Sequence, residues 1–280
     1  MINYTQNYFD LKLLRIKDIK LHETTETKRL RNIFDRIAKD RKLINPVIVG
    51  KHKNNYILID GANRLSSLQD IGCQLVLAQI IDYNNKRIKL KGWNHLIYNF
   101  DLQLIEIFCN SHKLEHEKIK YSAGKQIYNS SDNILLATDI KTENCIIVYL
   151  PKNLNKSILD LNKLTRLYFN VFPFDRSESE IKLPEIRKFT RRRGILIEFP
   201  LFDKKTIIKI AENKITQKIP AGITRHILIN RVLHVRINVK NLLYENDIKI
   251  KTTELEKYLL NKIDNNKVRQ YTESVIVFDE

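Results

Sequence analysis

The chain has 280 residues, of which 43% are hydrophobic and 29% are charged, and this is the composition of a soluble globular protein with room for two domains or one large one. No stretch approaches the roughly 18 uninterrupted apolar residues of a membrane span, and the polar N-terminus lacks the apolar core of a signal peptide. The three cysteines are far apart, without zinc-site or disulfide spacing, so we expect reduced thiols in a cytoplasmic protein.

Basic residues are in excess. With 49 Lys and Arg against 32 Asp and Glu, the formal net charge is +17, which favours an anionic partner such as DNA or a phosphorylated small molecule. The densest basic block, residues 187–194, needs such a partner only if its cations share one face. The chain is also rich in Lys, Ile and Asn throughout, so much of the lysine can simply solvate the surface.

The first third of the chain predicts alternating strands and helices. Apolar residues recur at helical spacing in the first helix, and Gly72 is a plausible C-cap for the second. Together these elements predict a compact α/β unit that ends near Tyr83. In chain order, we expect a strand and its exit at 11–21, a helix at 26–40, strands at 45–50 and 54–60, a helix at 62–72 and a strand at 74–83.

Longer, mixed elements follow, and no repeat or low-complexity linker precedes them. Because the whole chain has only 7 Gly and 6 Pro, we expect an α/β (α+β) fold in which a domain of residues 1–90 packs closely against a domain of residues 91–280. In the second domain we expect a helix over much of 95–118, strands at 133–140 and 144–151, a helix at 153–169, a strand at 194–200, two strands with a tight turn near Asn230 within 224–239, a helix at 252–263 and a strand at 273–278.

The most informative stretch is an apolar strand that ends on Asp60-Gly61 and turns at once into a polar-headed helix. A helix that begins near Ala62 presents unpaired backbone N–H groups and the positive end of its dipole, where a phosphate can bind. Gly61 lets the backbone approach the anion, Arg64 adds a fork of donors, and Asp60 can hold Mg²⁺. An ordinary structural turn has the same D-G-x-x-R pattern. Two hydroxyls that follow can also contact a phosphate: Ser66 and Ser67.

A second carboxylate precedes the first predicted helix. Glu23 stands in L-H-E, residues 21–23, just before two common N-cap residues, Thr24 and Thr25. The helix dipole favours an acid at a helix start, which is one explanation of Glu23. The other is a general base at the mouth of a site, placed to take a proton from a hydroxyl nucleophile.

Several motifs occur in a characteristic order along the chain. They are L-H-E at 21–23, N-P-V-I-V at 45–49, Y-I-L-I-D-G-A-N-R at 56–64, a tryptophan at 93, P-A-G-I-T-R at 220–225 and V-R-Q-Y-T at 268–272. In this order they resemble the ParB/sulfiredoxin-like free serine kinases, and among these the members encoded with siderophore synthesis. The resemblance covers residues 11–83 and roughly 218–280.

The resemblance implies a Mg²⁺-dependent transfer of a phosphoryl group from ATP, or else ADP, to the hydroxyl of free L-serine, giving O-phospho-L-serine for a biosynthetic pathway. It implies that residues 1–90 form a ParB/sulfiredoxin-like nucleotide-binding domain, and that residues 91–280 contribute the amino-acid pocket. The catalytic residues would be Glu23, as the base, and Asp60, which also holds the metal ion. The nucleotide would contact Gly61, Ala62, Asn63, Arg64, Ser66 and Ser67. The serine would contact Trp93, Thr224, Arg225 and His226.

One position departs from the family pattern. Where the family has D-G-x-H-R, this chain has Asn63, which can donate a hydrogen bond but cannot become cationic. The alternative is therefore a ParB-like DNA-binding regulator with a degenerate or switch-like nucleotide site. A sulfiredoxin-like reductase is a weaker alternative, because the phosphate motif has no cysteine and Cys73 is expected to be a buried structural thiol. Haem binding follows by family analogy only, and no membrane partner is expected.

Overall fold

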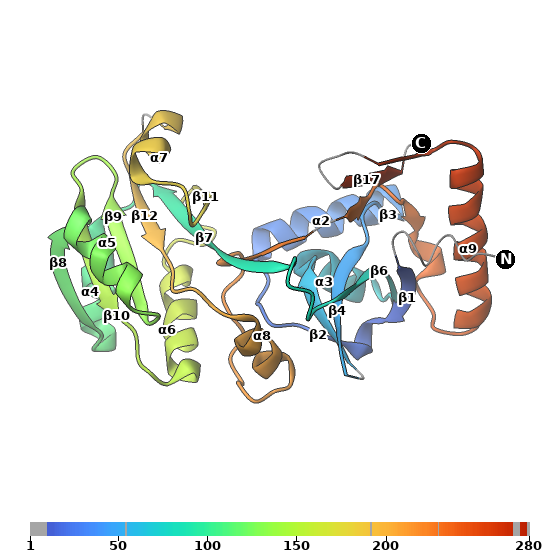
Figure 1. Ribbon diagram of the computed structural model, residues 1–280, viewed down its shortest axis with the longest axis horizontal. Helices are drawn as coiled ribbons and strands as arrows, with labels where there is room; N and C mark the ends of the chain where they lie inside the picture. Colours follow the sequence, from blue (N-terminus) through green and yellow to red (C-terminus); the bar gives the residue numbers. More distant parts are fainter. Residues whose placement is uncertain (1–9, 54, 191, 229, 271–274, 279–280) are drawn as a thin grey trace. The chain divides into compact units, whose positions relative to one another are not determined.

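The computed structural model describes residues 10–53, 55–190, 192–228, 230–270 and 275–278. The chain forms two compact units of mixed strands and helices (Figure 1), as the α/β expectation requires. Unit 1 comprises Met1–Lys89 together with His226–Glu280, and unit 2 comprises Leu90–Arg225.

The N-terminal part of unit 1 confirms the alternation of strands and helices expected from the sequence. Its elements are β1 (Leu11–Arg15), η1 (Ile16–Asp18), β2 (Ile19–Lys20), α2 (Thr27–Asp40), β3 (Lys42–Leu43), β4 (Val47–His52), β5 (Asn55–Asp60), α3 (Ala62–Ile71) and β6 (Leu75–Asp82). Five of the strands form a mixed sheet in the order β1-β6-β4-β5-β2, and α2 packs against α3. As expected, Gly72 ends α3 in the left-handed conformation, with φ of 92°.

The edge of this sheet brings two separate segments together. β2 runs parallel to β5, with Ile19 opposite Tyr56 and Lys20 opposite Ile57. Because parallel strands end at the same edge of a sheet, the segment that follows β2 emerges beside Asp60, the last residue of β5.

The C-terminal part of the chain completes the core of unit 1. Val232, Leu242 and Leu259 are buried in one apolar cluster with Leu65 and Leu77 from the N-terminal part. This shared core is why residues 226–280 group with the N-terminal part, whereas the sequence analysis placed them in the second domain. The C-terminal elements are β14 (Arg231–Leu233), β15 (Ile237–Asn238), η2 (Val239–Asn241), α9 (Ile248–Asp264), β16 (Val268–Gln270) and β17 (Val275–Phe278).

Unit 2 is built on an antiparallel sheet. Its elements are β7 (Lys89–Tyr98), α4 (Leu102–His112), β8 (Glu115–Lys120), α5 (Tyr121–Ser130), β9 (Ile134–Asp139), β10 (Asn144–Tyr149), α6 (Leu154–Arg166), β11 (Phe174–Glu178), α7 (Leu183–Phe189), β12 (Gly194–Glu198), α8 (Lys204–Ala211) and β13 (Thr224–Ile227). The first residue of β7 and the last two of β13 belong to unit 1. The strand order is β11-β7-β12-β9-β10-β8, and β13 pairs with β7. Helices α4 and α5 pack against β9 and β10.

Three expectations for the later part of the chain are confirmed only in part. The predicted helix over 95–118 is present only as α4 at Leu102–His112, between two strands, because the end of β7 is buried on both faces and its consecutive apolar residues have no strand-like alternation. The two strands near Asn230 do not pair with each other: β13 joins β7 and β14 joins β17. The last helix begins at Ile248, four residues before the expected start, and its N-cap is Asp247 instead of a threonine.

No helix among the described residues has the length and apolar character needed to cross a membrane.

The shared core of unit 1 predicts that α9 stabilises the N-terminal sheet. Leu259→Ala, at a position with 1% exposure, should lower the free energy of unfolding by about 2–4 kcal/mol, because it leaves a cavity. The neighbouring Leu260 is 40% exposed, so Leu260→Ala should cost at most about 0.5 kcal/mol. Urea unfolding measures both values. Hydrogen exchange in β4 and β6 should accelerate in the first variant alone, and unchanged exchange there would show that the two parts have separate cores.

Candidate active site

The turn between β5 and α3 is shaped around a glycine. Gly61 has φ of 107°, and a Cβ at this position would lie 2.9 Å from both Arg64 Nη2 and Val47 Cγ1. Gly61 is also the N-cap of α3, and no side chain caps the helix. The first N–H groups of α3 therefore remain available to an anion at the positive end of the helix dipole.

Asp60 gathers arginines from two distant parts of the sequence. Arg64 Nη2 lies 2.8 Å and Arg231 Nη2 lies 2.7 Å from the same oxygen, Asp60 Oδ2. Burial by itself raises the pKa of Asp60, but Arg64, Arg231 and the more distant Arg29 outweigh this effect and lower it below the usual value. Asp60 is thus a carboxylate at neutral pH, and the hydrogen bonds within the described residues leave its Oδ1 open.

Both arginines have donors to spare. The Nε atoms of Arg64 and Arg231 are buried and have no hydrogen-bond partner among the described residues. A buried guanidinium N–H without an acceptor is costly, and an oxyanion is the group that best satisfies two such forks. The start of α3 therefore has the donors and the charge of a phosphate site.

Sequence reasoning missed Arg231. Gln79 of β6, which is 4% exposed, holds the backbone on both sides of this residue: Gln79 Nε2 donates to the Asn230 carbonyl (2.7 Å), and Val232 N–H donates to Gln79 Oε1 (3.0 Å). Arg231 is thereby directed at Asp60, 171 residues away in sequence. Only its place in the C-terminal segment that carries the family resemblance could have drawn attention to it.

The segment that carries Glu23 is tied to this turn at both ends. His22 Nδ1 donates to the Leu58 carbonyl (2.8 Å), and the Glu26 N–H donates to Asn63 Oδ1 (3.3 Å). Since Leu58 is on β5 and Asn63 is in the first turn of α3, the half-buried Glu23 lies alongside the Asp60 turn. The structure therefore brings the two predicted catalytic carboxylates to the same edge of the sheet.

The side chain of Asn63, the residue that departs from the family pattern, has a defined orientation. Because Asn63 Oδ1 accepts the Glu26 N–H, the amide NH₂ of Asn63 is the part left to donate to a ligand.

The serines of α3 differ in their surroundings. Ser66 is half-buried, whereas Ser67 is fully buried and its hydroxyl contacts the carbonyls of Asn63 (2.7 Å) and Leu30 (3.3 Å). Ser67 thus packs α3 against α2, and we therefore do not propose it as a phosphate contact. Ala62 is 5% exposed, so its backbone is the part with ligand-binding capacity.

His226, one of the residues predicted to bind serine, is part of unit 1. Its Nε2 lies 2.9 Å from the Tyr83 hydroxyl, and its ring is edge-on to that of His22, with ring centroids 5.5 Å apart. Burial lowers the pKa of His22 to about 4, although its Leu58 hydrogen bond acts in the opposite direction. His22 is therefore a neutral ring at physiological pH.

The other three predicted serine contacts belong to unit 2. The Arg225 guanidinium is paired with Glu178 and lies 4.6 Å above the ring of Trp93. Thr224 is 8% exposed, and its hydroxyl has no hydrogen-bond partner among the described residues. Trp93 and Arg225 thus form one cluster, while Thr224 alternates to the other face of its strand.

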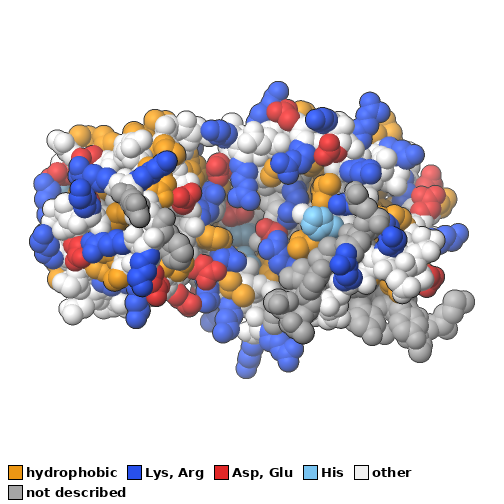
Figure 2. Space-filling model, turned by 90° about the horizontal axis from the view of Figure 1, so that it is seen from above, with side chains coloured by type: hydrophobic (Ala, Val, Ile, Leu, Met, Phe, Trp, Pro, Cys, Tyr) orange, Lys and Arg blue, Asp and Glu red, His pale blue; other side chains and the backbone are white. Residues whose placement is uncertain are grey.

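Two cations of the basic block at 187–194 are paired with carboxylates. Arg187 pairs with Glu143 at 2.8 Å, and Arg193 pairs with Asp139 at 3.0 Å. Figure 2 likewise shows Lys and Arg side chains spread over the visible face, with Asp and Glu among them. These pairings weaken the DNA-binding alternative, because a paired arginine is a poor phosphate ligand.

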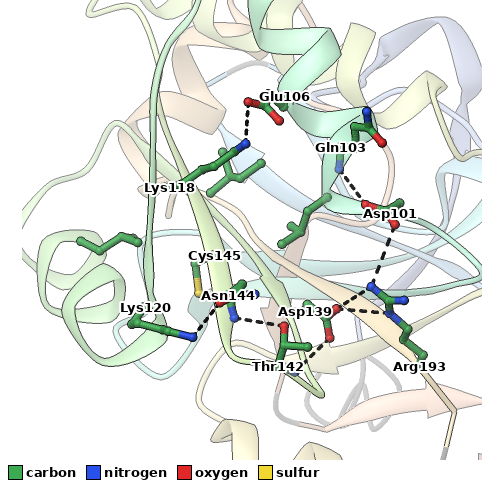
Figure 3. Close-up of a pocket in the computed structure, with 13 residues that line it drawn as sticks. Asp101, Gln103, Glu106, Lys118, Lys120, Asp139, Thr142, Asn144, Cys145 and Arg193 are labelled. Carbon is green, nitrogen blue, oxygen red and sulfur yellow. Dashed lines mark hydrogen bonds and ion pairs between the residues drawn. The ribbon is translucent and has the colours of Figure 1, made fainter.

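A hollow of about 700 Å³ in unit 2 is also lined by charged groups (Figure 3), but these satisfy one another. Lys118 pairs with Glu106 (2.8 Å), Lys120 donates to Asn144 (2.7 Å), and Asp139 accepts from Arg193. No lining side chain among the described residues has a buried polar atom without a partner. The hollow therefore has no group that requires a ligand.

Thiol chemistry finds no support. The three free cysteines are Cys73, Cys109 and Cys145. Burial raises the pKa of each thiol to about 11, so the thiolate form is negligible at neutral pH. The interpretation of Cys73 as a buried structural thiol is confirmed.

Comparison with known proteins places these features in context. No family model matches the chain. The ATP-dependent L-serine kinase SbnI of Staphylococcus aureus is 22% identical over 277 residues, which span 96% of this chain and 97% of the relative. The structure of C-terminally truncated SbnI from the same organism superimposes with a TM-score of 0.70 at 20% identity, covering 94% of this chain and all of the other. A mutant free serine kinase solved with ADP has a TM-score of 0.66 at 14% identity, covering 84% and 95%. The resemblance to the ParB-like free serine kinases is thereby confirmed over nearly the whole chain, and the chain has the fold of these proteins.

Proposed function

We propose that this chain is an ATP-dependent kinase of free L-serine. The observation that carries the proposal is the pair of arginines at the uncapped start of α3, each with a buried and unpartnered Nε–H, beside a segment that holds Glu23. The full-length likeness to an ATP-dependent L-serine kinase, and the fold shared with a free serine kinase that was solved with ADP, support the same activity.

The phosphate chain of the nucleotide would lie at the start of α3. Backbone N–H groups of Ala62 and Asn63 would bind phosphate oxygens, together with the guanidinium groups of Arg64 and Arg231. Gly61 allows this approach, because any Cβ there would collide with Arg64. The half-buried Ser66 is a further candidate contact.

The residues at the start of α3 are suited to a Mg²⁺ ion whose ligands are mainly phosphate oxygens. The described residues include no group of three His, Cys, Asp or Glu side chains that could hold a metal ion by themselves. One carboxylate with an open oxygen, Asp60 Oδ1, is the protein contribution expected for a magnesium ion that otherwise binds phosphate oxygens and water. When bound, Mg²⁺ would neutralise charge on the phosphates.

Glu23 would act as the general base. A serine hydroxyl is a poor nucleophile, so its proton must leave as the new O–P bond forms and the bond from the γ-phosphorus to the bridging oxygen of ADP breaks. A half-buried carboxylate beside the phosphate turn is suited to accept that proton. The arginines would stabilise negative charge on the equatorial oxygens and the leaving ADP.

The serine contacts remain a prediction: Trp93, Thr224, Arg225 and His226. We also propose, from the sequence resemblance, that O-phosphoserine feeds a biosynthetic pathway such as siderophore precursor synthesis. A DNA-binding role has less support, because two arginines of the densest basic block, Arg187 and Arg193, are paired with carboxylates.

The direct test incubates the purified protein with L-serine, Mg²⁺ and either ATP or ADP, and detects O-phosphoserine by mass spectrometry. O-phosphoserine formed with ATP would support the proposal. O-phosphoserine formed with ADP but not with ATP would mean that ADP is the phosphoryl donor. Nucleotide binding without O-phosphoserine would reject kinase activity.

Glu23→Gln should lower serine phosphorylation by roughly 100-fold or more, the scale of a lost general base. Nucleotide affinity and melting temperature should stay near native, because the amide keeps the size of the side chain. Steady-state kinetics and calorimetry measure the two effects. Near-native turnover would reduce Glu23 to an acid at a helix start.

Arg231→Ala and Arg64→Ala should each weaken ATP binding by about 1.5–3 kcal/mol, because each removes charged hydrogen-bond donors from the phosphate site. Arg31→Ala is the matched control, since Arg31 is an exposed residue of α2 paired with Asp35. Calorimetric titration with ATP compares the three. If Arg231→Ala binds ATP as tightly as the control does, Arg231 only anchors the C-terminal segment.

Asn63→His should preserve nucleotide binding and raise turnover by about tenfold, which corresponds to roughly 1.4 kcal/mol of added transition-state stabilisation. In the neutral ring, one nitrogen can replace Oδ1 as the acceptor for Glu26 N–H while the other donates to a phosphate oxygen. When both nitrogens are protonated, the ring gives up the Glu26 contact but carries positive charge near the phosphates. Single-turnover kinetics on both proteins measures the change. Lower turnover at unchanged affinity would mean that the site has adapted to asparagine.

A further inference from the structure

Helices α2 and α3 run side by side in the same direction. The Glu26 N–H, at the start of α2, donates to Asn63 Oδ1 in the first turn of α3 (3.3 Å). One turn further along both helices, Ser67 Oγ donates to the Leu30 carbonyl (3.3 Å). Since the contacts advance along both helices together, the two helix starts lie together, and the positive ends of both dipoles meet beside Asp60.

Arg29 stands in the first turn of α2, at the edge of the face that meets α3. Glu26 and Leu30 contact α3, and Arg29 is about 60° around the helix from Glu26, because successive residues are about 100° apart. No side chain caps the start of α2. Helical side chains lean toward the N-terminus, so the exposed side chain of Arg29 extends toward this open end.

The charge of Arg29 is unusual for its position. The first turn of α2 contains no acidic residue, and its second and third residues are Lys28 and Arg29. The helix dipole disfavours cations there in the free protein, whereas both the dipole and the cations favour a bound anion. A helix start with this charge is therefore suited to receive a phosphate.

Arg29 is the third arginine near Asp60. Burial raises the pKa of Asp60, but Arg64, Arg231 and Arg29 together lower it. The ion pairs of Asp60 within the described residues are with the half-buried Arg64 and Arg231, so Arg29 acts on Asp60 through space. One carboxylate thus stands among three guanidinium groups, of which Arg29 is the exposed one.

The role proposed for Glu23 indicates which phosphate would lie near Arg29. A general base must lie next to the hydroxyl whose proton it takes, and that hydroxyl must lie next to the phosphorus that it attacks. Glu23 is in the segment that leads into α2, six residues before Arg29. The transferred phosphoryl group would thus lie on the α2 side of the site, while Asp60 holds Arg64 and Arg231 at the start of α3.

We propose that Arg29 binds the phosphoryl group that is transferred, and that it thereby makes the site select ATP over ADP. This role rests on the proposed function. As the bond from the γ-phosphorus to the bridging oxygen of ADP breaks and the bond to the serine oxygen forms, the proton of the serine hydroxyl goes to Glu23. The guanidinium of Arg29 stabilises the equatorial oxygens of the moving group throughout this step.

Calorimetric titrations with AMP-PNP, ADP and AMP in the presence of Mg²⁺ compare the native protein with Arg29→Ala; AMP-PNP is an ATP analogue that resists phosphoryl transfer. The variant should bind AMP-PNP about 10- to 100-fold more weakly, the loss expected for a charged hydrogen bond. Its affinities for ADP and AMP should stay within about twofold of native. Its melting temperature without nucleotide should not fall, because a cation has been removed from the positive end of a helix.

The rate of O-phosphoserine formation from ATP provides a second measurement. In single-turnover experiments, Arg29→Ala should form the product about 100-fold or more slowly than the native protein at saturating ATP. Arg29→Lys keeps the charge but loses the planar fork, so it should recover only part of the rate and of the AMP-PNP affinity. A residue that only stabilised α2 would change the melting temperature and would not separate AMP-PNP from ADP.

The matched control is Arg36→Ala. Arg36 is also exposed and lies on the same edge of α2, seven residues further from its start, which is about 10 Å along the helix. This variant should bind all three nucleotides as the native protein does. An equal loss of AMP-PNP affinity in both variants would mean that the overall charge of α2 attracts the nucleotide, and would overturn the specific role of Arg29.

Native AMP-PNP affinity in Arg29→Ala, an equal loss for all three nucleotides, or no nucleotide binding by the native protein would each overturn the proposal. A loss confined to AMP-PNP, together with no O-phosphoserine from the native protein and ATP, would reject the serine kinase and retain Arg29 as the residue that recognises the terminal phosphate. O-phosphoserine formed at the native rate by Arg29→Ala would retain the kinase and reject the role of Arg29.

Discussion

The ion pairs of Asp60 with two arginines hold the candidate site together. One carboxylate oxygen joins the end of β5, the first turn of α3 through Arg64, and the C-terminal segment through Arg231. Without Asp60, two guanidinium groups at the positive end of a helix would repel each other. With it, they are held side by side and keep donors for a phosphate. The same oxygen therefore stabilises the free protein and organises the site for an anion.

The position of Arg231 depends in turn on the core of unit 1. Val232 is buried among residues from both ends of the chain, and Gln79 holds the backbone on either side of Arg231. Because Gln79 holds the backbone beside Arg231 and Asp60 holds its guanidinium, the side chain has little freedom left to lose when a ligand binds. This arrangement accounts for the inclusion of residues 226–280 in unit 1.

The start of α3 differs from the hollow of unit 2 in how its polar groups are satisfied. The charged groups that line the hollow pair with one another. At the start of α3, Arg64 and Arg231 have buried Nε atoms without a partner among the described residues. Because an unpaired buried polar group is costly, two such donors beside an uncapped helix start are the feature expected of an anion site.

Local signals in the sequence were enough to predict the strand–turn–helix around Asp60: an apolar strand, a glycine that tolerates positive φ and a helical repeat. The sequence also determined that Glu23 and Asp60 are candidate carboxylates, through the order of short motifs. The packing of the folded chain was needed to show that Arg231 pairs with Asp60, that Ser67 packs two helices together, and that β13 and β14 join different sheets. Ion pairs across 171 residues and the choice of strand partners depend on packing of the whole core, which no local pattern records.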